Sequence, residues 1–237
     1  MKTSHSIRSG RAVRRQAGAS TAEFLLVMPF ALMLVLGIIQ IGLMYSAKSL
    51  LNHAAFMAAR AGAVQNARTG PMNDALMQGL IPFYQDTSNS NDYTRLAGAI
   101  SAARADVAFV SLAELSPSPD AFADFGITSG ASGGHTYIPN DNLEFRSHAA
   151  GASSGLSVQD ANTLKIKVTY GYALKVPLVG VLVKAIMCGI DSGVNAFGRG
   201  NETAHASPSD CALYYSQGRV PLVAYATVPM QTPAWKN

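Results

Sequence analysis

An uninterrupted apolar segment near the N-terminus constrains this chain more than any other feature. From Phe24 to Ala47, 24 residues carry no charge, and only Gln40, Tyr45 and Ser46 add polar groups. As a helix this segment would extend about 36 Å, which exceeds the roughly 30 Å hydrocarbon core of a bilayer. A helix buried in a soluble core is usually amphipathic or shorter. The segment therefore predicts one membrane-spanning helix.

The charges on either side of this segment predict its orientation. Five of the 18 basic residues precede Gly18, where there is no acidic residue. This excess favours a cytoplasmic N-terminus, with the bulk of the chain on the other side of the membrane. Without these five residues, 13 basic residues face 14 acidic ones, so the formal charge of +4 comes from the leader. No basic stripe remains, and we expect no nucleic-acid partner.

The helical pattern continues beyond the apolar segment. Residues 47–68 contain no proline, and small residues recur between Ala54 and Ala63, where they would let helices approach closely. We expect one continuous helix of about 45 residues, bent at Pro29, which removes a backbone hydrogen bond. A cleaved signal peptide also follows a basic leader, but its apolar region is usually only about 7 to 15 residues long.

The junction between leader and apolar segment places Gly18 five residues before Glu23. This spacing resembles the processing site of type IV prepilins, at which a prepilin peptidase would cut after Gly18 and make Ala19 the new N-terminus. Glycine allows close approach to the backbone. A carboxylate at the edge of an apolar helix needs a partner, such as the freed amine of a neighbouring subunit. Ser20 and Glu23 also match a capping box at the helix start, and the two roles can coexist.

A longer set of features resembles the TadE-like family of minor pseudopilins, which belongs to Tad (type IVc) pilus systems. The shared features are an opening Ser-x-x-Glu-Phe at Ser20, an early proline at Pro29, glycines within the apolar run, an aromatic residue at Tyr45 and a closing Ala-Ala-Arg-Ala-Gly-Ala at residues 58–63. The final residues, 230–237, differ from the arginine-containing ending of that family.

The resemblance implies a membrane-anchored minor pseudopilin that contributes to assembly of a Tad-type pilus or secretion filament. The implied partners are a prepilin peptidase, other pilin or pseudopilin subunits, inner-membrane pilus assembly proteins and the lipid bilayer, and Glu23 would act in subunit assembly. The implied fold class is α+β: a long N-terminal transmembrane helix followed by a small extracytoplasmic α+β head with an antiparallel sheet. We expect a cleaved basic leader at 1–18, the transmembrane and extended helix at 19–70 and the head at 71–237. The expected location is the bacterial inner membrane, with the head in the periplasm or in an extracellular pilus.

The rest of the chain predicts the elements of the head. Helical patterning covers residues 71–84 and 93–110. Alternating apolar and polar residues predict strands at 164–172 and 220–228. Residues 116–161 are rich in Ser, Gly, Pro, Asn and Asp, which favours long surface loops with one short strand at His135 to Ile138.

Two features close to the last strand are open to alternatives. Residues 176–186 form an apolar run that is too short to span a membrane, and we favour a core helix over one that lies on the membrane surface. Cys188 and Cys211 would close a disulfide loop in an oxidising compartment and would be free thiols in the cytosol.

No arrangement of residues in the sequence predicts catalysis. The five histidines show no pair at metal-ligand spacing, and the glycine-rich residues 130–134 lack the lysine of a phosphate loop. We therefore expect a protein that is not an enzyme and uses no cofactor or metal. Two other interpretations compete with the pseudopilin. One is a signal-anchored periplasmic binding or sensor module with an uncleaved N-terminus, and the other is an exported enzyme released by cleavage beyond the apolar run.

Overall fold

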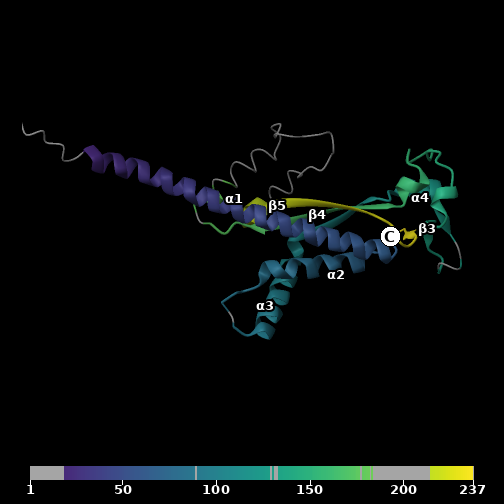
Figure 1. Ribbon diagram of the computed structural model, residues 1–237, viewed down its shortest axis with the longest axis horizontal. Coiled ribbons are helices and arrows are strands. Elements are labelled where there is room, and N and C mark those ends of the chain that lie inside the picture. Colours follow the sequence, from purple (N-terminus) through teal and green to yellow (C-terminus); the bar gives the residue numbers. More distant parts are fainter. Residues whose placement is uncertain are drawn as a thin grey trace, which may run out of the picture.

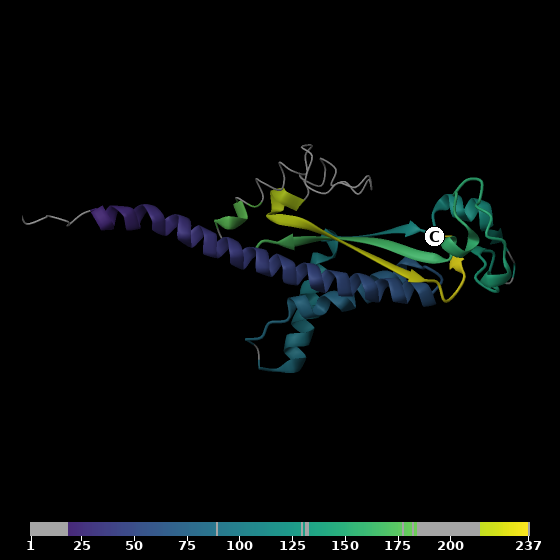
Figure 2. The ribbon, with the colours of Figure 1, turned by 45° about the horizontal axis from the view of Figure 1, so that its top comes forward.

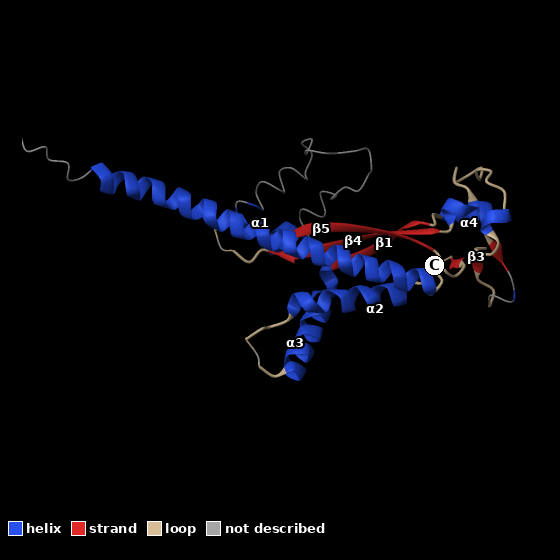
Figure 3. Cartoon of the chain, viewed as in Figure 1, coloured by secondary structure: helices blue, strands red, loops and turns tan. Residues whose placement is uncertain are grey.

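The computed structural model describes residues 19–88, 90–128, 130, 133–176, 178–181, 183 and 214–236. One long helix runs along the molecule, and its N-terminal half projects away from everything else (Figure 1). A three-stranded sheet and a second helix lie against its C-terminal half, and a third helix extends away from it beyond the second (Figures 1 and 3). A group of short elements lies at the end farthest from the projecting half (Figures 1 and 3).

Helix α1 (Ala19–Val64) is continuous over 46 residues, or about 69 Å. It confirms the predicted uninterrupted helix, and Pro29 lies inside it. Before Gln40 almost all described side chains are exposed, whereas from Gln40 onward one face is buried. The buried residues of this face are Gln40, Ala47, Leu51, Ala54, Ala55, Ala58, Ala59, Gly62 and Ala63. We call this second half of α1, together with the described residues that follow it, the head.

The larger sheet is antiparallel and places β4 (Thr163–Ala173) between β1 (Val110–Ser116) and β5 (Arg219–Pro229). Strand β4 pairs with β5 along its whole length, from Thr163 opposite Pro229 to Ala173 opposite Arg219. Alternate side chains of β4 are buried and join the core formed with α1: Leu164, Ile166, Val168, Tyr170 and Tyr172. The two predicted strands are thus confirmed as β4 and β5.

Two helices follow α1: the first covers its buried half from a second side, and the second packs mainly against the turn that ends the first. Helix α2 (Thr69–Leu80) continues into the 3-10 turn η1 (Ile81–Tyr84), and α3 (Asp92–Ala105) continues into η2 (Asp106–Phe109). These elements confirm the predicted helical segments, except that residue 110 begins β1.

Small residues bring α1 close to its own chain. A methyl group placed on Gly79 of α2 would lie only 2.7 Å from the Cα atom of Ala54. The small residues between Ala54 and Ala63, which we expected to support close helix packing, therefore do so largely within the chain, because α2 and the sheet bury most of them.

The prediction of long surface loops over residues 116–161 is wrong in two places. This region contains the helices α4 (Pro119–Phe125) and α5 (Val158–Ala161), and the side chains of Phe122 and Val158 are buried. The predicted short strand is confirmed as β3 (Thr136–Ile138). It lies between β2 (Ile127–Thr128) and β6 (Ala234–Trp235) in a small second sheet. The turns η4 (Leu143–Phe145) and η5 (Tyr215–Gln217) complete the described elements.

The last described residues close the C-terminal end of α1. The backbone amides of Gln231 and Thr232 both donate to the carbonyl of Ala63, at 2.9 and 3.1 Å. Beyond the helix, Asn66 has a positive φ of 60°, and its side-chain amide donates to the carbonyl of Pro233 at 2.8 Å. The ending that differs from the family pattern therefore caps the long helix. With a long apolar helix, shorter helices and antiparallel sheets, the chain has the predicted α+β fold.

Candidate functional site

The projecting half of α1 is the candidate functional surface, because it is apolar and almost unburied. Between Phe24 and Ile39 every residue is exposed except Leu36 and Gly37, which are half-buried. Among the described residues, one helix is long and apolar enough to cross a membrane, and only 6% of its most apolar window is buried. A core helix of a soluble protein has the same composition but is mostly buried. By length, composition and exposure, α1 is suited to anchor the protein with a single pass.

The predicted processing junction lies where this helix begins. Ala19 is the first residue of α1, and Gly18 lies outside the described residues. Glu23 follows one turn later with an exposed side chain, and it takes part in none of the hydrogen bonds or ion pairs found among the described residues. It is therefore an available carboxylate at the edge of an apolar surface, where a cationic partner would be strongly favoured.

Two polar side chains of α1 fasten the helix to the segment that follows β4 and to β5. Gln40 is completely buried, and its Oε1 atom accepts a hydrogen bond of 2.9 Å from the backbone amide of Val176. Two turns later, the Lys48 ammonium donates to the backbone carbonyl of Val223 in β5. In the sequence alone, Gln40 is only a polar interruption of the apolar run. Its position as the only amide within the apolar run was the available signal that this helix face meets protein.

The helix continues without a break from its apolar half into the core of the head. A cut directly after the apolar run would fall within this continuous helix, next to the buried Ala47 and Leu51. This arrangement does not favour the alternative in which a conventional signal peptide is removed there to release the head.

The predicted disulfide involves residues that the structure does not describe. Cys188 and Cys211 both lie outside the described residues, and the pairing stays a prediction. Within the part of the chain that is described, no three His, Cys, Asp or Glu side chains come together as a metal site would require.

The comparison with known proteins bears on this same helix. Residues 18–60 match the family model described as TadE-like protein. This segment is TadE-like. The match begins at Gly18 and covers the projecting half of α1 and most of the half packed in the head, so the predicted resemblance is confirmed. No curated protein and no solved structure gives a significant match to the chain.

A half-buried polar cluster joins the turns η1 and η2 to the sheet. Arg219 makes two hydrogen bonds to the Asp106 carboxylate, at 2.8 and 3.1 Å, and its guanidinium lies 3.8 Å from the ring centre of Phe109. The Tyr84 hydroxyl donates to the same carboxylate at 2.9 Å, and Tyr170 therefore donates to Tyr84 at 2.9 Å. The carboxylate is thus fully engaged by three donors, which is typical of a structural bridge.

This cluster lowers the pKa of Asp106 and raises the pKa of Tyr84. Burial alone would raise the pKa of Asp106, but the hydrogen bonds from Arg219 and Tyr84 outweigh it and hold that pKa below its usual value. Burial, together with the neighbouring Tyr170 and Asp106, raises the pKa of Tyr84 well above its usual value. The cluster therefore keeps Asp106 ionised and Tyr84 neutral over the physiological range.

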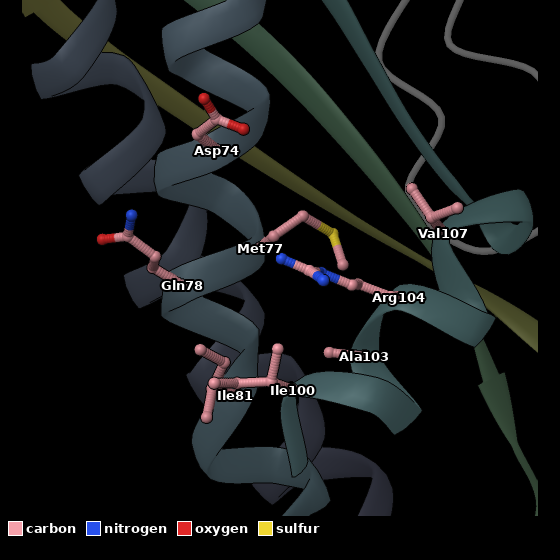
Figure 4. A pocket seen from close by; sticks show the side chains of 8 residues that line it. All are labelled: Asp74, Met77, Gln78, Ile81, Ile100, Ala103, Arg104 and Val107. Atoms are coloured by element: carbon pink, nitrogen blue, oxygen red, sulfur yellow. The ribbon is translucent and has the colours of Figure 1, made fainter. Parts of the chain in front are cut away.

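A groove with a volume of about 450 Å³ lies between α2 and α3. Figure 4 shows Met77 and Arg104 pointing toward each other across it, with Ile81 and Ile100 close together at one end. Ile100 of α3 and Val107 of η2 line this groove and stay partly exposed. The groove lies on the head, away from the processing junction.

Proposed function

We propose that this protein is a membrane-anchored minor pseudopilin that contributes to assembly of a Tad-type (type IVc) pilus or secretion filament. The observation that carries the proposal is a single helix that begins at the Gly18-Ala19 junction, exposes an apolar half of spanning length and then enters the core of a small head. The TadE-like match over residues 18–60 supports the same role. The protein acts as a structural subunit and not as an enzyme.

The proposed sequence of events starts with membrane insertion. The basic leader stays in the cytoplasm, and the head is carried to the other side of the membrane. A prepilin peptidase cuts after Gly18 and frees the amine of Ala19. The exposed carboxylate of Glu23 then pairs with the amine of a neighbouring subunit, which removes an unpaired charge from the apolar surroundings as the helices pack.

Processing is tested by replacing Gly18 with phenylalanine. The larger side chain should hinder approach of the peptidase to the backbone, so mass spectrometry should find the leader still attached in cells that contain the peptidase. The matched control is Gly10→Phe, which places the same change within the leader and should leave cleavage intact. Normal cleavage of the Gly18 variant would contradict the assigned junction.

Assembly is tested by replacing Glu23 with glutamine, which keeps the size of the side chain and removes its charge. The variant should insert and lose its leader normally, but it should be incorporated poorly into filaments. The control Glu144→Gln removes another exposed carboxylate, on the distal side of the head, and should assemble normally. Normal filaments from both the Gly18 and Glu23 variants would refute the proposed roles.

Mass spectrometry of the unmodified protein also separates the competing functions. An intact N-terminus in cells that contain the peptidase and build Tad pili would favour an anchored binding or sensor module. Release of a soluble head from the membrane would favour an exported enzyme.

A further inference from the structure

The end of the head that adjoins the projecting half of α1 has an apolar outer surface. It is formed by residues 174–176 and 178–181, which follow β4, and we call it the proximal lip. Leu178 and Val181 are 70% and 68% exposed, whereas Val179 between them is buried. The lip and Gly218 line a shallow hollow of about 320 Å³. Figure 2 shows this end of the sheet beside α1, at the point where the helix leaves the head.

The hydrogen bond between Val176 and Gln40 fixes the level of the lip along α1. It ties the lip to a residue that lies inside the apolar run, and not to the polar stretch beyond it. A helix needs roughly 20 residues to cross the hydrocarbon core. Counted from Phe24, such a span ends near Leu43, about one turn beyond Gln40. The lip therefore lies at the level where the hydrocarbon core should end.

The span cannot move toward the N-terminus without cost. A shift by one turn would clear the lip from the bilayer, but it would draw the exposed carboxylate of Glu23 into the hydrocarbon core, where an unpaired charge is strongly unfavourable. A shift in the other direction would bury the lip more deeply. The exposed Tyr45 lies just beyond Leu43, at the depth where aromatic side chains concentrate in membrane proteins.

We propose that the proximal lip is a membrane-contacting surface that inserts Leu178 and Val181 into the boundary between headgroups and acyl chains of the leaflet on the head side. The lip is continuous with the apolar surface of α1, so one lipid surface covers both. Lys175 in the same lip can extend its ammonium to anionic headgroups while its stem stays in the apolar layer. The inference rests on the proposed membrane anchor. It adds a second contact, which fixes the orientation of the head against the bilayer.

Tryptophan fluorescence in vesicles tests the inference with the full-length chain. The only tryptophan, Trp235, stacks on His135 at the distal end of the head and is replaced by phenylalanine. Leu178→Trp or Val181→Trp is then introduced, and the protein is reconstituted with phosphatidylglycerol and with phosphatidylcholine brominated on its acyl chains. Phe30→Trp reports on the anchor, and Phe145→Trp, at an 83% exposed distal position, is the matched control. Circular dichroism verifies that each variant is folded.

We expect the two lip reporters to show blue-shifted emission and to lose intensity in brominated vesicles, as Phe30→Trp does, while Phe145→Trp keeps its emission. Quenching at position 30 without quenching at positions 178 and 181 would overturn the lip contact and leave the anchor intact. No quenching at position 30 would overturn the anchor and the lip contact together. Equal quenching at position 145 would also overturn the inference, because the head would then adsorb without a defined orientation.

Discussion

Replacing Gly79 with alanine tests the close contact between α1 and α2. The added methyl group would lie 2.7 Å from the Cα atom and 2.8 Å from the Cβ atom of Ala54, so the backbones of the two helices must separate. Overpacking of this kind costs about 1 to 3 kcal/mol. Alanine gains up to about 1 kcal/mol over glycine from helix propensity, and less here because Gly79 is the penultimate residue of its helix. We expect a net destabilisation of roughly 1 to 2 kcal/mol.

Gly98 provides a control with the opposite sign. It lies inside α3, and nothing lies within 4 Å of the position that a methyl group would occupy. Gly98→Ala should therefore stabilise the fold by about 0.5 to 1 kcal/mol, because alanine has the higher helix propensity and meets no clash here.

Thermal unfolding of the full-length protein in detergent, followed by near-ultraviolet circular dichroism, measures both effects. A head of this size shifts its midpoint by roughly 2 to 4 °C for each kcal/mol. Gly79→Ala should thus lower the midpoint by roughly 2 to 8 °C, and Gly98→Ala should raise it by about 1 to 4 °C. An equal rise for both variants would refute the close approach of α2 to α1.

Two further predictions concern polar contacts of the head. Asp106→Asn should cost about 2 kcal/mol, because Arg219 loses a mostly buried ionic partner. Although burial opposes ionisation, Arg219 and Tyr84 hold the pKa of Asp106 below its usual value. The ionised carboxylate therefore stabilises the fold fully above about pH 4, the pKa of an unfolded aspartate. This stabilisation is lost as the pH falls through the lower pKa of the folded state. Acid titration of the circular dichroism signal should show this dependence in the wild type and a weaker one in the variant, and identical titrations would contradict the assignment. Thr232→Val should cost about 1 kcal/mol, because the backbone amide of Asn66 loses its hydroxyl acceptor at 3.0 Å; an unchanged urea midpoint would be evidence against this contact.

The long helix and the two long strands could be predicted from the sequence because their patterns extend over many residues. A charge-free run of 24 residues has few alternatives to a helix. Residues 164–172 alternate strictly, and burial in β4 follows the same alternation as far as Tyr170. The processing junction and the role of Glu23 also depend only on spacing along the chain, and both stay predictions.

The short helices of the distal region were missed because their composition is typical of loops. Ser118 caps α4 by accepting a hydrogen bond of 3.2 Å from the amide of Ala121, and Pro119 occupies the first helical position. Ser157 caps α5 in the same way, accepting from the amide of Asp160 at 3.2 Å. Serine, proline and aspartate are common in loops, but in this order they also begin helices.

Features that depend on distant partners could not be predicted from local patterns. Strand β1 is an edge strand in which exposed and half-buried residues alternate, and its identity depends on pairing with β4. The proximal lip is placed by a bond between Gln40 and Val176, which are 136 positions apart in the sequence. No periodicity within either segment indicates that the two meet.

The cap on α1 has a consequence for the order in which the protein is made. Ala63 in the last turn of α1 receives its hydrogen bonds from Gln231 and Thr232, which are synthesised 168 and 169 positions later in the chain. The helix can therefore form long before its far end is satisfied. The head acquires its complete hydrogen bonding only after residues 231 and 232 have been made, and a chain that stops before residue 231 would leave the end of its longest helix open.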